Sequence, residues 1–155
     1  MLQYDYKYGK HPEFRNRPSK GGLCALKIQE SAENYLESIY MIHKKKGNVR
    51  SIDIVNELDL SKPSVSVAMK NLRENGYILM DSATGFISLT DKGTVIAEKM
   101  YERHMLLSGL LVHLGVDPET AVEDACRMEH VISAQTFEAL KKHAEDMKKY
   151  EKRQQ

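Results

Sequence analysis

The chain has 155 residues, of which 41% are apolar, enough for one hydrophobic core or for two small cores that share an interface. Its net charge of +1 excludes a strongly basic or strongly acidic protein and by itself says nothing about function. The sequence has no apolar run of transmembrane length and no signal peptide, and its two cysteines, Cys24 and Cys126, are too few for a disulfide scaffold. We therefore expect a cytoplasmic protein without a membrane partner.

Residues 1–27 mix glycine and proline with polar residues and show no periodicity, which predicts a mobile N-terminal arm. The arm is basic, so it could touch DNA backbone, although short basic tails are usually only solvated. From Ser31 the pattern becomes helical, and Gly47 ends it. The apolar positions that recur at helical spacing are Tyr35, Leu36, Ile39, Tyr40 and Ile42.

Two short helices, Ser51–Leu58 and Ser61–Gly76, follow with the length and pattern of a helix-turn-helix. Ser61 is expected to cap the second helix, and Pro63 suits its first turn, where the missing N–H has no intrahelical partner in any case.

Two strand-like runs come next, Tyr77–Met80 and Phe86–Leu89, and the segment between them, 81–85, has the composition of a hairpin turn. A hairpin directly after a helix-turn-helix is typical of a winged helix. The hairpin would be the wing.

The second helix of a helix-turn-helix lies in the major groove of DNA, with its N-terminal residues at the base edges. Hydroxyl and ammonium groups in this region can bond to bases and phosphates, and Arg50 and the lysines at 44–46 could flank the duplex. A purely structural helix pair is the alternative, which the following hairpin disfavours. The predicted DNA-binding residues are Ser61, Lys62, Pro63, Ser64, Ser66, Lys70 and Arg50.

Three further helices are predicted. Thr90 caps a long helix, Asp91–Leu114, which ends at Gly115. A second helix starts at Pro118 and runs through His130, and a charged third helix begins at Ser133 and extends toward Tyr150. Residues 148–155 are expected to fray.

The second of these helices carries potential metal ligands. Residues three and four apart share a helix face, so Cys126 lies beside Glu129 and His130 and presents thiolate, carboxylate and imidazole together. This triplet can also arise by chance. His104 on the preceding helix could join it if the helices pack suitably, and Glu37 shares a face of the first helix with Asn34. Such mixed donors suit iron(II), manganese(II), cobalt(II) or nickel(II), with zinc as an intruder.

Three segments together resemble the diphtheria-toxin-repressor family of iron- and manganese-dependent regulators, particularly its shorter manganese-responsive form. They are residues 31–40, residues 62–66 of the helix-turn-helix, and residues 123–133, which contain Cys-Arg-Met-Glu-His. The resemblance implies a winged-helix homodimer, a metal that acts as corepressor, and a double-stranded, near-palindromic operator. It places Glu37, His104, Cys126, Glu129 and His130 at ligand positions.

Asn34 departs from the family pattern, since the iron-responsive branch has methionine there and the manganese-responsive branch aspartate. Cys126 resembles the iron branch, whereas Glu37 resembles the manganese branch. Two positions that complete an ancillary site in the iron branch hold Ser108 and Val122, neither of which is a good ligand. The expected corepressor is therefore Mn(II) or Fe(II), with Co(II), Ni(II) or Zn(II) as possible substitutes and Asn34 as an uncertain ligand.

The expected fold is mainly α, with a winged helix-turn-helix over 28–93 and an all-helical metal-binding and dimerisation domain over 94–147. The expected function is a metal-dependent repressor that controls genes of metal-ion homeostasis. Two alternatives stay open: a winged-helix regulator that senses thiol oxidation at Cys126, and a metalloenzyme, for which the sequence shows no catalytic motif.

Overall fold

The computed structural model describes residues 23–153, which form six helices and a two-stranded sheet in the order α1-α2-α3-β1-β2-α4-α5-α6. By their contacts these residues divide into two compact units between Glu98 and Lys99, within the continuous helix α4 (Asp91–His113). Most of the predicted N-terminal arm (1–27) lies outside the described residues.

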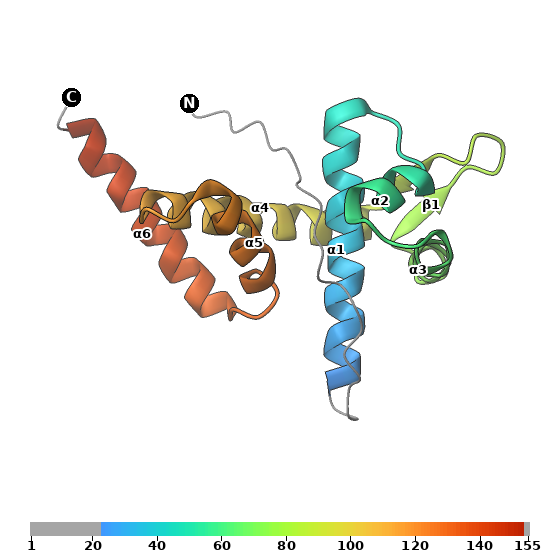
Figure 1. The fold of residues 1–155 in the computed structure, drawn as a ribbon, viewed down its shortest axis with the longest axis horizontal. Helices are drawn as coiled ribbons and strands as arrows, with labels where there is room; N and C mark the ends of the chain where they lie inside the picture. The colour runs from blue at the N-terminus through green and yellow to red at the C-terminus, as the bar shows by residue number, and fades with distance from the viewer. Residues whose placement is uncertain (1–22, 154–155) are drawn as a thin grey trace. The chain divides into compact units, whose positions relative to one another are not determined.

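Helix α1 (Leu23–Lys46) begins well before Ser31, where the sequence pattern predicted its start. Residues 23–30 are good helix formers that directly follow two glycines, so nothing stops the helix from extending back to them. Its buried side chains Leu36, Ile39 and Ile42 form one face that packs against α2 (Ser51–Leu58) and α3 (Lys62–Glu74). In Figure 1 both short helices lie on the same side of α1.

The helix-turn-helix has the predicted caps. Asp59 adopts a left-handed backbone conformation with φ 50° after α2, and the Leu60 N–H then donates to the Val55 carbonyl. Ser61 caps α3 by accepting the Ser64 N–H at 3.2 Å, and Pro63 lies in the first turn. Both predictions are confirmed, and together they define where α3 starts and which residues it exposes.

The core of the first unit joins α1, α2 and α3 to the sheet. Ile54 of α2 and Val65 and Met69 of α3 are fully buried together with Ile78 and Ile87 of the strands. Because α3 buries one side only, its opposite side is exposed to solvent.

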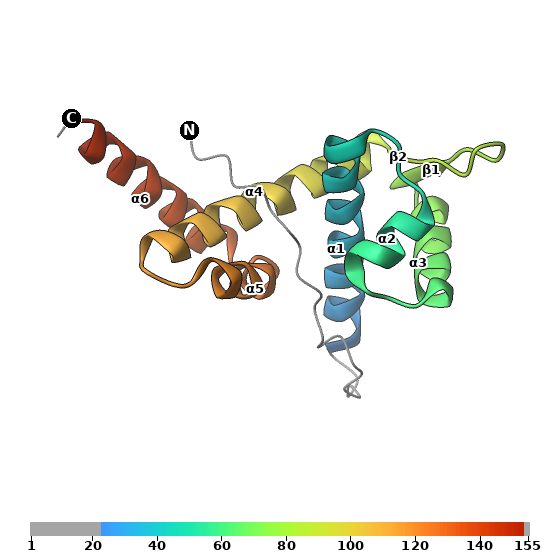
Figure 2. The same cartoon turned by 45° about the horizontal axis from the view of Figure 1, so that its top comes forward.

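The predicted wing is confirmed as an antiparallel hairpin of β1 (Ile78–Met80) and β2 (Ile87–Leu89), with Leu79 opposite Ser88. The Asp81 carboxylate accepts hydrogen bonds from the N–H groups of Ala83 and Thr84, which tightens the turn. These bonds hold the pKa of Asp81 below its ordinary value. Figure 2 shows the hairpin projecting beyond α3.

The start of α4 is tied to the wing by Thr90 and Gly93. The Thr90 hydroxyl donates to the Gly76 carbonyl at 2.8 Å and accepts the Gly93 N–H at 3.1 Å, so Thr90 caps α4 as predicted. Gly93 packs so closely on the backbone just before β1 that a Cβ atom there would clash with the Tyr77 carbonyl oxygen.

Replacing Gly93 by alanine should therefore destabilise the first unit, because backbone would have to move to accept the methyl group. We expect a loss of about 1–3 kcal/mol in the free energy of unfolding, measured by urea denaturation. Gly109→Ala is the matched control on the same helix, since a Cβ there would meet nothing within 4 Å. The control should be neutral or stabilising by up to ~1 kcal/mol, and equal effects of the two substitutions would contradict the close approach.

The second unit consists of the remainder of α4 with α5 (Pro118–Met128) and α6 (Ala134–Arg153). Gly115, at φ 93°, follows α4 as predicted, and Ser133 accepts the Thr136 N–H at the start of α6. The prediction that one helix runs through His130 is wrong, because α5 ends at Met128. Helix α6 continues to Arg153, through most of the segment expected to fray.

The early end of α5 has a physical cause. The N–H groups of Val131 and Ile132 both donate to the Met128 carbonyl, and the bond from Val131 spans three residues in place of the four of an α-helix. The Arg103 side chain donates hydrogen bonds to the carbonyls of Glu129 and Ile132.

Within residues 23–153, no helix combines the length and the apolar character needed to cross a membrane.

Candidate metal centre and nucleic-acid interface

The buried part of the second unit brings two imidazoles onto one carboxylate. His104 Nδ1 lies 2.9 Å from Glu129 Oε2, and His130 Nε2 lies 3.3 Å from Glu129 Oε1. The side chain of Glu129 is completely buried, and those of His104 and His130 are 1% and 6% exposed. Three of the predicted ligands, from α4 and from the turn after α5, are thus in direct contact.

The electrostatics of this cluster favour an ionised carboxylate. Burial alone would raise the pKa of Glu129, but hydrogen bonds from His104 and His130, and the charge of both imidazoles, outweigh it and hold this pKa below its ordinary value. A buried carboxylate in contact with two imidazoles offers oxygen and nitrogen donors together, a combination that suits divalent transition metals.

Cys126 lies in the last turn of α5 and is a partly exposed thiol. Glu129 follows the helix as its cap residue, with helical backbone angles and its N–H on the Ala125 carbonyl at 3.0 Å. The shared helix face predicted for Cys126 and Glu129 is therefore retained. The same argument fails for His130, which lies beyond the helix and reaches Glu129 through the turn.

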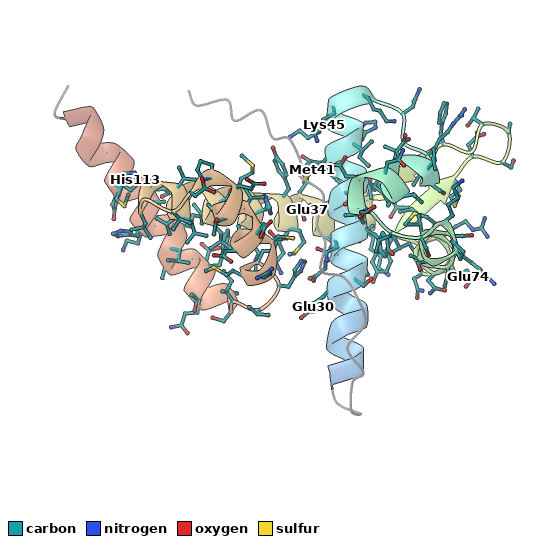
Figure 3. The ribbon with its side chains drawn as sticks, viewed as in Figure 1. Glu30, Glu37, Met41, Lys45, Glu74 and His113 are labelled. Carbon is teal, nitrogen blue, oxygen red and sulfur yellow. The ribbon has the colours of Figure 1, made fainter. Side chains whose placement is uncertain are left out.

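The remaining predicted ligands, Glu37 and Asn34, lie in the first unit on α1. Glu37 is buried, whereas Asn34 is partly buried. Their spacing of three residues puts them on one helix face. Figure 3 shows Glu37 and Met41 on the side of α1 that faces away from α2 and α3. Glu37 is thus a buried acid on the face of α1 opposite the helix-turn-helix.

Ser108 is one of the two residues that replace the ancillary ligands of the iron branch according to the sequence prediction. Its buried hydroxyl donates to the His104 carbonyl at 2.7 Å, one turn earlier on α4. Val122 is an apolar residue of α5. The hydroxyl of Ser108 therefore serves the helix backbone next to the cluster.

The donor set is chemically suited to a divalent transition metal. In the second unit His104 and Glu129 are buried, and each offers one ligand atom, while Glu37 is a buried carboxylate of the first unit. Imidazole nitrogen and carboxylate oxygen suit manganese, iron, cobalt, nickel and zinc, and a thiolate from Cys126 would move the preference toward softer ions. The residues present therefore fit the metal that the sequence resemblance implies.

The exposed face of α3 carries the predicted DNA contacts. Ser61, Lys62, Pro63, Ser64, Ser66 and Lys70 are all exposed, whereas Val65, Met69 and Leu72 point into the core. The hydroxyls of Ser61 and Ser64 are 2.8 Å apart, and Lys70 lies 3.9 Å from Glu74. An exposed ion pair of this length is weak and leaves the lysine available for phosphate.

The basic residues around the helix-turn-helix are held in place by neighbours. The Arg50 guanidinium lies 4.8 Å from the centre of the Phe86 ring, at the base of the wing. Lys46 pairs with Asp53 at 2.5 Å and Lys45 with Glu57 at 3.5 Å. Partial burial alone would raise the pKa of Asp53, but the bonds from Lys46 and the Arg50 N–H outweigh it and hold this pKa below its ordinary value. The lysine run thus helps to hold α1 against α2.

Two residues of interest were missed from the sequence. Val67 on the outer face of α3 is 60% exposed, an unusual position for an apolar side chain. On a helical wheel Val67 falls between Ser64 and Lys70, so the sequence could have indicated that its side chain is exposed. Arg103 is buried and bonded to the turn after α5, and no sequence pattern predicts such a contact.

This winged helix, followed by a helical unit with a buried His-Glu-His cluster, defines a DNA-binding regulator with a metal-binding domain. Residues 27–85 match the family described as "Iron dependent repressor, N-terminal DNA binding domain". Residues 90–155 match "Iron dependent repressor, metal binding and dimerisation domain". The chain belongs to this family of metal-dependent transcriptional regulators, which are not enzymes.

Individual relatives agree with this assignment. An uncharacterised HTH-type transcriptional regulator of Methanocaldococcus jannaschii is 33% identical over 78% of this chain and 98% of its own length. The HTH-type transcriptional regulator MntR of Listeria monocytogenes is 34% identical over 71% of this chain and 77% of its own. Among solved structures, the manganese regulator SloR matches with a TM-score of 0.65 and 29% identity, over 74% of this chain and 53% of that protein. The chain thus spans about half the length of that solved relative.

Proposed function

We propose that this regulator represses genes of metal-ion homeostasis by binding operator DNA as a homodimer when it holds Mn(II) or Fe(II). The observation that carries the proposal is the buried contact of one ionised carboxylate, Glu129, with the imidazoles of His104 and His130. Glu37, Cys126 and Asn34 are the further proposed ligands, and Co(II), Ni(II) or Zn(II) are possible substitutes. The names of the similar proteins, which include a manganese regulator, support this choice.

The proposed mechanism couples the two units. When bound, the metal supplies a cross-link between donors of the first and second units. Glu37 is the donor from α1, and His104 and Glu129 are the buried donors from the helical unit. Holding these side chains together restrains the helix-turn-helix relative to the dimer, so that both α3 helices fit successive major grooves. The gain in DNA-binding free energy equals the difference in metal-binding free energy between the restrained and the unrestrained arrangement of the two units, which is typically about 1–3 kcal/mol.

The decisive test is an anaerobic titration of the metal-free protein with Mn(II) and with Fe(II), while DNA binding is followed by fluorescence anisotropy. The probe is a duplex selected in vitro by the Mn(II)-treated full chain. We expect at least one metal to strengthen binding about 5- to 150-fold, and the selected site to be near-palindromic with half-sites about one helical turn apart or a multiple of it. DNA affinity that does not respond to either metal or to a chelator would refute the proposal.

The proposed DNA face predicts a particular salt dependence. Lys62 lies at the exposed start of α3, where an ammonium group can neutralise one phosphate. Replacing it by alanine in both subunits should reduce the slope of log K against log salt by about 0.9 per lost phosphate contact. Lys99→Ala, an exposed lysine of α4 outside the helix-turn-helix, is the control. An unchanged slope for Lys62→Ala would remove this residue from the interface.

A regulator that senses oxidation of Cys126 is the second candidate, because this thiol is partly exposed at the candidate site. Replacing Cys126 by aspartate separates the two mechanisms, since a carboxylate can bind metal but cannot be oxidised as a thiol. We expect Cys126→Asp to keep a metal-dependent gain in DNA affinity, with preference shifted toward Mn(II). Loss of the metal response, together with peroxide-sensitive DNA binding of the unsubstituted protein, would favour thiol oxidation.

A further inference from the structure

Arg103 occupies a buried position next to the metal cluster. It directly precedes His104 on α4, and only 7% of it is exposed. One terminal nitrogen, Nη1, donates to the Glu129 carbonyl at 2.7 Å and to the Ile132 carbonyl at 3.3 Å. The guanidinium carbon lies 5.2 Å from the centre of the Phe137 ring on α6. One side chain thus contacts both the turn after α5 and the start of α6.

This arrangement is unusual for a charged residue. Buried arginines are normally paired with acids, whereas the hydrogen bonds of Arg103 within residues 23–153 go to backbone carbonyls. Its Nε atom is buried and has no hydrogen-bond partner in that part of the chain. A methionine or leucine could fill the same space without this penalty, so packing alone does not explain the arginine.

The two accepting carbonyls define what the arginine holds. They belong to Glu129 and Ile132, the residues at the two ends of the turn that contains His130. A side chain that merely capped α5 would bond to carbonyls of its last helical turn, 125–128, whereas both acceptors lie beyond it. The guanidinium therefore ties the turn to α4, the helix that carries His104.

We propose that Arg103 is a positioning residue for the metal centre, which keeps the turn bearing Glu129 and His130 in register with His104. This inference rests on the proposed function, because it assumes that these three residues bind the metal. Residues that hold metal ligands from behind typically change metal affinity 10- to 100-fold when replaced. Lysine cannot substitute fully, because a single ammonium lacks the planar fork that bonds to carbonyls and stacks on the Phe137 ring.

The test is Arg103→Lys in the full-length protein, with Mn(II) binding measured by calorimetry and Co(II) binding by visible absorption. We expect Mn(II) affinity to fall about 10- to 100-fold and the absorption bands of the Co(II)-saturated protein to shift or weaken. The Co(II) spectrum reports the arrangement of the ligands, which a general loss of stability does not alter at saturation. Phe137→Leu keeps both hydrogen bonds but removes the ring, so it should change affinity in the same direction by a smaller factor.

Two matched controls separate positioning from stability. Lys141→Met removes the 2.5 Å contact of Lys141 with Glu102, which also joins α4 to α6 but does not touch the turn. Ala121→Gly destabilises α5 at a fully buried position. Both controls should leave Mn(II) affinity within about twofold of the parent and the Co(II) spectrum unchanged.

The outcomes distinguish the two proposals. If the unsubstituted protein binds none of Mn(II), Fe(II) and Co(II), the proposed function fails. If it binds them and Arg103→Lys binds equally well with the same Co(II) spectrum, only the positioning role is overturned. An equal fall in affinity for Ala121→Gly would also overturn it, because stability alone would then account for the effect. If Arg103→Lys does not fold, Phe137→Leu tests the positioning role with the same two measurements, Mn(II) affinity and the Co(II) spectrum.

Discussion

Glu129→Gln is expected to abolish metal-dependent DNA binding, with Mn(II) affinity reduced by more than about 100-fold. The substitution retains shape but removes the one negative charge that two imidazoles contact in the buried cluster. A divalent ion would then lose the charged donor of the buried His-Glu-His cluster, and its own charge would be less well compensated there. That factor exceeds the usual effect of residues that only support metal ligands. Calorimetry with Mn(II) and anisotropy on the selected duplex measure the two effects.

The control for this experiment is Glu119→Gln, the same chemical change at an exposed position in the first turn of α5. It should affect neither metal nor DNA binding. The metal-free Glu129→Gln protein should remain folded, because the amide can still bond to His104. Metal affinity within a few-fold of the parent would show that the carboxylate is a structural partner of the two histidines and would remove Glu129 from the proposed site.

Much of the first unit was predictable from sequence because local chemistry determines it. Ser61 and Pro63 define the start of α3, and the segment from Asp81 to Gly85 defines the hairpin turn; each signal acts over a few residues. Short-range signals of this kind are independent of tertiary structure. The residues exposed on α3 follow from the same start point, whereas their contact with DNA stays a prediction.

The end of α5 could not be predicted in this way. Residues after Met128 have no strong helix-breaking signal, and the helix ends where Arg103, from a different helix, takes up two carbonyls. The contact between His130 and Glu129 consequently depends on a turn that only tertiary structure defines. Helical spacing predicted that Cys126 lies beside Glu129 and His130, but it did not predict a contact between the neighbouring residues Glu129 and His130.

The basic residues at the end of α1 have contacts that the sequence did not indicate. The lysine run at 44–46 suggested contacts with DNA, which stay a prediction, and the structure shows that Lys45 and Lys46 pair with acids of α2. A sequence without structure cannot tell a phosphate-binding lysine from one that joins two helices, because both need only an exposed ammonium at the end of a helix.

The proposed coupling between the units leads to the second large effect. Glu37 is the buried acid of α1, in the unit that carries α3, whereas His104 and Glu129 belong to the helical unit. Glu37→Gln should therefore leave a weakened metal site but remove most of the metal-induced gain in DNA affinity. We expect the DNA affinity of the Mn(II)-saturated variant to lie within about threefold of the metal-free protein, in place of the 5- to 150-fold gain typical of such coupling.

Glu30→Gln is the matched control, because Glu30 lies on the same helix and is only partly buried. It should retain the full metal response. The important comparison is between metal binding and DNA binding at saturating Mn(II), since a ligand can shift an equilibrium only by its difference in affinity for the two states. If Glu37→Gln lowered metal affinity but kept the full gain at saturation, activation would arise within the helical unit alone. The regulator would then transmit the signal through the continuous helix α4, and Glu37 would not be the link.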